Sequence, residues 1–164
     1  MNAVNVLKPG DLIFYPDDDA WKHNFFAWLQ KIGGEMGKVQ YPGYTHVAMV
    51  SSEPDIIIQM KWPRPNFEFF ADDMRPKVIY RPMCSDAVKI RAIYWCYMNI
   101  NDHYSFLNMI LGKFGVTQCH KVCSGWVDTA FKESGFPLTP MLDKLISPNE
   151  LASSEVLDYV MSST

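Results

Sequence analysis

Apolar residues in much of the first half of the chain occur in short runs bounded by proline, glycine and aspartate. Runs of this length predict β-strands. The expected strands are Leu12–Tyr15, Thr45–Val50, Asp55–Trp62 and Lys77–Tyr80. A turn across Ser51–Pro54 would join the second and third of them as a hairpin. Residues 63–76 are rich in proline, so we expect a loop-rich segment there and no long helix.

Elsewhere the apolar residues are spaced by three and four, which is the period of an amphipathic helix. The expected helices are Ala20–Ile32, Ala87–Asn99, Tyr104–Leu111, Cys123–Ser134 and a terminal helix that begins at the capping box Ser147–Glu150. The apolar face of the second is expected to carry Ile90, Ile93, Tyr94 and Tyr97, and that of the fourth Trp126, Val127, Ala130 and Phe131. Strands followed by helices indicate an α+β fold.

Length and composition predict one domain over residues 1–164. Of the 164 residues, 48% are hydrophobic, which is enough to build one sizeable core. The formal net charge of -3 gives no reason to expect a nucleic acid as partner, because nucleic-acid binders usually display a concentrated basic surface. The chain shows neither a transmembrane run nor the pattern of a secretory signal, so we expect a cytoplasmic protein.

The four cysteines of the chain are Cys84, Cys96, Cys119 and Cys123. Without an export signal they are expected to be free thiols. Cys123 falls in the first turn of an expected helix, where unpaired backbone N–H groups and the helix dipole favour a thiolate. It is therefore the candidate nucleophile, and a buried structural cysteine is the alternative interpretation.

Three segments resemble the signature blocks of the NlpC/P60 papain-like cysteine hydrolases: Pro9–Tyr15, Thr45–Val50 and Cys123–Val127. Because His46 precedes Cys123, their order is similar to that of the circularly permuted branch, which includes YiiX-like and lecithin:retinol acyltransferase-like proteins. The resemblance covers most of the chain. It implies a circularly permuted papain-like fold, in which an antiparallel sheet packs against helices.

The resemblance also implies roles for four residues. Cys123 would attack the substrate and His46 would be its general base. Gln59, on the strand after His46, would orient the imidazole, although a glutamine that faces water is the alternative. Tyr104 would donate a hydrogen bond to the oxyanion, or would only pack within its helix.

The function implied is hydrolysis of an amide or ester bond through a thioester on Cys123, with a peptide-like or acyl small molecule as substrate and no cofactor. Cell-wall peptides and lipid acyl groups both occur as substrates in the superfamily, so the substrate stays open. Val122 stands where the family usually has Asp or Asn, and the third residue is uncharged. These departures favour a non-catalytic binding module as the alternative, and a lipid acyltransferase or thioesterase is the third hypothesis.

Cys119, His120 and Cys123, with His103 upstream, raise the hypothesis of a zinc site, because thiolate and imidazole are the ligands that zinc prefers. The spacing argues against it. Structural zinc sites usually combine two separate ligand pairs, and the remaining histidines and cysteines form no second pair. The sequence therefore predicts no metal.

Overall fold

The computed structural model describes residues 6–16, 43–53, 55–61, 63–72, 76–103, 122–140 and 146–163. In these ranges six strands form one antiparallel sheet in the order β4-β3-β2-β1-β5-β6. The strands are β1 (Leu12–Pro16), β2 (Tyr44–Val50), β3 (Ile56–Met60), β4 (Pro65–Phe69), β5 (Lys77–Pro82) and β6 (Leu157–Ser163). The helices are α2 (Asp86–Met98), α4 (Cys123–Glu133), α5 (Pro148–Ala152) and the 3-10 helix η3 (Phe70–Asp72). The predicted α+β class and the four predicted strands are confirmed, with ends shifted by one or two residues.

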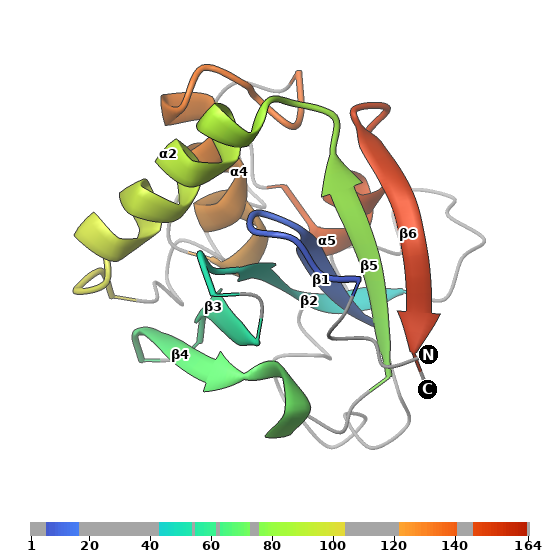
Figure 1. Ribbon diagram of the computed structural model, residues 1–164, viewed down its shortest axis with the longest axis horizontal. Helices are drawn as coiled ribbons and strands as arrows, with labels where there is room; N and C mark the ends of the chain where they lie inside the picture. Colours follow the sequence, from blue (N-terminus) through green and yellow to red (C-terminus); the bar gives the residue numbers. More distant parts are fainter. Residues whose placement is uncertain are drawn as a thin grey trace, which may run out of the picture.

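Alternate side chains of the central strands divide between two apolar clusters on opposite faces of the sheet. In β1, Leu12 and Phe14 belong to the cluster that includes α2 and α4, whereas Ile13 and Tyr15 belong to the cluster on the other face. Figure 1 shows α2 and α4 side by side against the sheet. The first cluster is therefore the layer that fixes α4, and with it Cys123, against β2.

The helix α4 begins at Cys123, and the stripe of four apolar side chains predicted for it is buried in the first cluster. Each large apolar side chain buried in this way contributes about 2 kcal/mol. The Ser124 hydroxyl donates to the carbonyl of Ile146, which ties the first turn of α4 to the segment before α5. From α5, Asn149 Oδ1 accepts a hydrogen bond of 2.7 Å from the backbone N–H of Tyr44 at the start of β2. The beginnings of α4, α5 and β2 are thus held together.

The prediction for the buried face of α2 is wrong. The exposed residues include three that the pattern places inside: Ile90, Tyr94 and Tyr97. The buried residues of the helix are Lys89, Ala92, Ile93 and Cys96. Both sets have helical spacing, so periodicity does not choose between them. The side chains of Ala92 and Cys96 are small and let α2 pack closely on α4, whereas a tyrosine keeps its hydroxyl group near water more easily at the surface.

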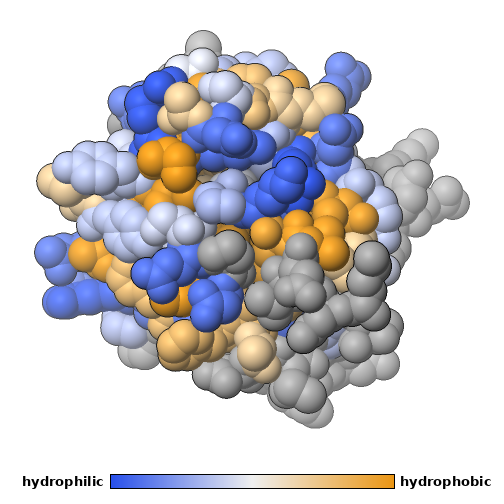
Figure 2. All heavy atoms as spheres, in the orientation of Figure 1, coloured by the Kyte–Doolittle hydropathy of each residue, from blue (hydrophilic) through white to orange (hydrophobic). Residues whose placement is uncertain are grey.

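Two edge strands lie where the sequence predicts other structure. β4 occupies part of the expected loop, and β6 follows α5, which ends after five residues although its predicted capping box is present. Proline is tolerated at the first residue of an edge strand, where Pro65 stands in β4. Each edge strand also exposes part of its apolar residues, such as Phe69 and Tyr159, so neither gives a clear buried face in the sequence. Figure 2 shows that apolar side chains reach one face of the molecule in small groups among polar ones.

A buried ion pair joins the turn before β1 to β5. The side chain of Asp11 is fully buried, and its two oxygens accept hydrogen bonds of 2.8 and 2.7 Å from Nε and Nη2 of Arg81. The backbone N–H of Lys8 donates to the same carboxylate at 2.9 Å.

Gly10, with φ of 81°, lets the turn pass directly under the side chain of Lys89, since a Cβ at Gly10 would lie 2.7 Å from the Cβ of Lys89.

Several predictions lie outside the described residues: the helices Ala20–Ile32 and Tyr104–Leu111, and the side chains of Tyr104, Cys119 and His120. Among the helices that the structure describes, none has the length and apolar character needed to cross a bilayer.

Candidate active site

A hydrogen bond joins two of the predicted site residues across β2 and β3. His46 Nε2 lies 2.8 Å from Oε1 of Gln59. A carbonyl oxygen accepts hydrogen bonds and does not donate them, so Nε2 carries a proton in this contact. In the neutral imidazole Nδ1 then keeps its lone pair. Nδ1 is therefore the ring atom of His46 that can take a proton from a nucleophile.

The register of the hairpin explains how these residues meet. Met49 pairs with Ile58 and Val50 with Ile57. Continued along the strands, this register makes His46 and Gln59 diagonal neighbours on one sheet face. Although His46 and Gln59 are 13 residues apart in sequence, the hairpin therefore places both side chains on one face without a bulge. On the other side of β2, Tyr15 of β1 pairs with His46, and the two ring centroids are 5.5 Å apart.

Cys123 is the first residue of α4, and its side chain is 2% exposed. The preceding residue, Val122, is the N-cap and makes no side-chain capping bond. The thiol lies close enough to β2 for the backbone of Val47 to contribute to lowering its pKa. The thiol of Cys123 thus lies at the backbone of Val47, which directly follows His46 on β2.

The side chains of His46 and Val47 leave opposite faces of β2. Val47 belongs to the apolar cluster around α4, whereas His46 stands beside Tyr15 of the other cluster. The backbone N–H of Val50 donates to Asp11 on the β1 side, so by strand alternation the N–H of Val47 points toward β3. The thiol therefore lies on the face of the sheet that α4 covers, at the edge of β2 that faces β3. Gln59, on β3, contacts His46 across the same edge.

The expectation that the helix terminus makes Cys123 a thiolate is wrong for the protein in this state. Burial raises the pKa of the thiol, and this effect outweighs the hydrogen bonds from the backbone of Val47 and from Ser124, which lower it. The neutral thiol therefore prevails at neutral pH. A nucleophilic Cys123 would have to give up its proton to a base during the attack.

The thiol is also closed to a substrate in this state. A cavity of about 630 Å³ is lined mainly by residues of the segments around α5, among them Leu138, Ile146 and Val156, but neither Cys123 nor His46 lines it. Because Cys123 is 2% exposed, a substrate carbonyl group does not reach its sulfur in this state.

A polar group that the sequence analysis does not predict adjoins Gln59. Glu68 on β4 accepts hydrogen bonds of 2.7 Å from Lys61 Nζ and 3.1 Å from Asn66 Nδ2. Burial acts to raise the pKa of Glu68, but contacts with Lys61, Asn66 and Gln59 together lower it. The signal in the sequence was the alternation of Asn66 and Glu68 with two phenylalanines, which the expectation of a loop concealed.

Among the described residues, no group of three or more His, Cys, Asp or Glu side chains gathers in a way that could hold a metal ion.

Comparison with known proteins gives a match in structure and none in sequence. No family model matches the chain, and no curated protein matches its sequence. A crystal structure described as that of the metalloprotein YiiX from Escherichia coli O157:H7 matches with a TM-score of 0.67 and 11% identity. The match covers 96% of this chain and 98% of that one. At this identity the likeness shows the fold alone, and the chain has a YiiX-like α+β fold.

Proposed function

We propose that the protein is a cysteine hydrolase of the circularly permuted NlpC/P60, papain-like type, which cleaves an amide or ester bond. The observation that carries the proposal is the 2.8 Å contact between His46 Nε2 and Gln59 Oε1, next to the residue whose backbone meets the thiol of Cys123. A nucleophile, a base and a group that orients the base are the parts that such chemistry requires. The likeness to YiiX supports the fold of the proposal only.

In the proposed reaction, Nδ1 of His46 takes the thiol proton while Cys123 Sγ forms a bond to the substrate carbonyl carbon. The tetrahedral intermediate collapses as the bond to the leaving amine or alcohol breaks, and the imidazolium returns a proton to that group. Water, deprotonated by His46, then hydrolyses the thioester and restores the thiol. The backbone N–H of Cys123 and the predicted donor Tyr104 would stabilise the oxyanion.

Because burial raises the pKa of the Cys123 thiol, the proposed proton transfer accompanies the attack and does not precede it. Gln59 supports this step by keeping Nδ1 unprotonated before the attack and by accepting the Nε2 hydrogen bond afterwards. It carries no charge to stabilise the imidazolium, so we expect a weaker base than in a triad with Asp or Glu.

A non-catalytic binding module is the second candidate, favoured by the burial of Cys123 and by the raised pKa of its thiol. This function would keep the fold and the His46–Gln59 contact but would not use the thiol as a nucleophile. The reactivity of Cys123 distinguishes the two candidates.

The test is the rate at which iodoacetamide alkylates each cysteine near neutral pH, followed by peptide mass spectrometry. Cys96 is fully buried and Cys84 partly exposed, so they serve as internal references. The hydrolase proposal predicts that Cys123 reacts faster than both and that His46→Ala slows it by about 100-fold. His103→Ala, at an exposed histidine, is the matched control and should leave the rate unchanged. A Cys123 rate no higher than that of Cys84 or of Cys96, or a rate that His46→Ala leaves unchanged, favours the binding module.

A further inference from the structure

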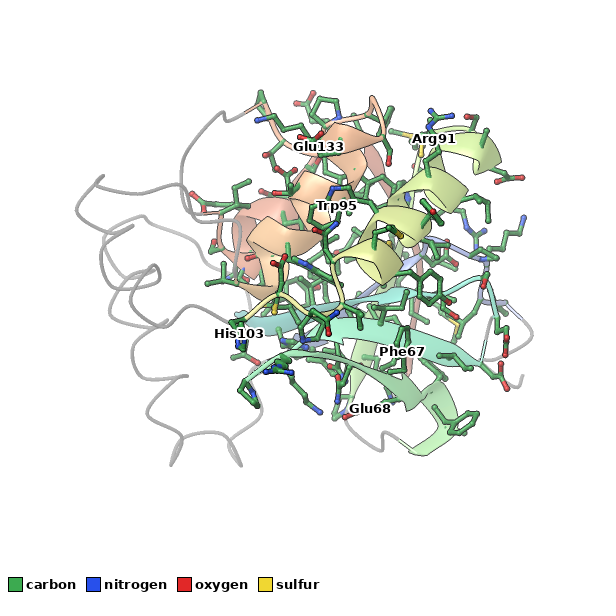
Figure 3. All side chains as sticks on the ribbon, turned by 90° about the vertical axis from the view of Figure 1, so that its left-hand side faces the viewer. Phe67, Glu68, Arg91, Trp95, His103 and Glu133 are labelled. Atoms are coloured by element: carbon green, nitrogen blue, oxygen red, sulfur yellow. The ribbon has the colours of Figure 1, made fainter. Side chains whose placement is uncertain are left out.

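Glu68 lies beside Gln59 on the neighbouring strand. β3 and β4 pair with Gln59 opposite Asn66 and Ile57 opposite Glu68. Gln59 and Glu68 are therefore diagonal neighbours on one sheet face, at a separation that long side chains bridge. Figure 3 shows Phe67 on the side of β4 toward α2 and Glu68 on the opposite side. His46, Gln59 and Glu68 thus follow one another across β2, β3 and β4 on the same face of the sheet.

The carboxylate of Glu68 is held in place by two donors. Lys61 Nζ and Asn66 Nδ2 both donate to Oε1, at 2.7 and 3.1 Å. A carboxylate has further acceptor positions on its two oxygens. Glu68 therefore has the capacity to accept a hydrogen bond from Gln59 as well.

The amide of Gln59 has two different ends, and its surroundings decide which end faces His46. Gln59 is fully buried, and its Nε2 makes no hydrogen bond of ordinary geometry with a described residue. Glu68 is nevertheless near enough for the Gln59 amide to contribute to lowering the pKa of its carboxyl group. A carboxylate only accepts, so it favours the orientation in which the NH2 end faces Glu68 and the carbonyl end faces His46.

We infer that Glu68 is a positioning residue: its carboxylate selects the orientation of the Gln59 amide and, through it, the tautomer of His46. With the amide reversed, its NH2 group would donate to Nε2, and the ring proton would move to Nδ1. Nδ1 would then be unable to take the proton of Cys123. The inference rests on the proposed function for this consequence, but the tautomer itself is measurable without any substrate.

The test is the tautomer of neutral His46, read from the chemical shifts of its two ring nitrogens by NMR at about pH 8, above the ordinary pKa of histidine. His46→Gln identifies the signals among the four histidines of the chain. The wild-type protein should hold His46 almost entirely as the Nε2–H form. In Glu68→Met, which keeps a side chain of similar length without an acceptor, this form should fall to about one half, because neither amide orientation is then preferred.

Two further variants separate positioning from a merely structural role. Lys61→Met removes the ion-pair partner of Glu68 and should keep the Nε2–H form. Gln59→Glu combined with Glu68→Met places an acceptor directly at His46 and should restore that form fully. The inference is overturned if Glu68→Met keeps the wild-type tautomer, or if Lys61→Met shifts it as much as Glu68→Met does. Because no substrate is involved, a protein without hydrolytic activity that shows the expected tautomers would refute the proposed function and leave this inference standing.

Discussion

Replacing Asp11 by alanine is expected to lower the free energy of unfolding by about 3 kcal/mol. The fully buried carboxylate accepts three hydrogen bonds, two from Arg81 and one from the backbone of Lys8. Removing one partner of a buried ion pair typically costs about 3 to 5 kcal/mol, because the other charge is left without compensation. The side chain of Arg81 is 25% exposed and can regain some hydration, which places the expected loss at the lower end.

Urea unfolding followed by tryptophan fluorescence measures this loss, and a thermal scan should show a decrease in Tm of about 6 to 12 °C for a chain of this size. Arg81→Met should be at least as damaging, since it leaves the carboxylate of Asp11 buried and unpaired. The double variant should lose clearly less than the sum of the two single losses, with a coupling energy of about 2 kcal/mol. Asp158→Ala, at the exposed residue that pairs with Arg81 on β6, is the control and should change stability by less than about 0.5 kcal/mol. Additive losses in the double variant, or an Asp11→Ala loss below about 1 kcal/mol, would show that the ion pair between Asp11 and Arg81 does not stabilise the fold.

Two further predictions concern Asp128 and Gly10. Burial raises the pKa of Asp128 despite its hydrogen bonds from Thr139, so the wild-type protein should lose stability relative to Asp128→Asn as the pH rises from about 4 through the raised pKa. Urea unfolding at several pH values checks this, and a pH-independent difference would contradict it. Gly10→Ala should cost about 2 kcal/mol or more by calorimetry, because the new Cβ meets Lys89 at a positive φ. Gly135→Ala, at a similar φ with open space around it, should cost about 1 kcal/mol, and equal costs would exclude the steric explanation.

The sequence predicts best the elements whose apolar residues are buried on a clear pattern. β1 and α4 are examples, because nearly every apolar side chain in them lies in a core cluster. The sequence does not predict the buried face of α2, because two sets of residues have helical spacing and only packing against α4 decides between them. It fails also for β4, an edge strand that begins with Pro65 and exposes both of its phenylalanines.

The contact between His46 and Gln59 can be predicted from the sequence if the two strands form a hairpin, but only the observed register shows that both side chains lie on one face. The protonation state of Cys123 cannot be predicted in this way. Its place at the start of α4 favours a thiolate, but the amount of burial depends on how α4 packs on β2, and here burial outweighs the helix terminus. Glu68 escaped notice because its position relative to Gln59 depends on a strand that the sequence does not predict.

Acylation by a small activated ester such as p-nitrophenyl acetate measures whether Cys123 attacks an acyl carbon with His46 as its base. Intact-protein mass spectrometry on a rapid time scale should show the mass of one acetyl group, located on Cys123 by peptide mapping. The adduct should be absent in Cys123→Ala and should form about 100-fold more slowly in His46→Gln. Acetylation that favours another residue would exclude Cys123 as the nucleophile, and acetylation of Cys123 at the same rate without His46 would exclude His46 as its base.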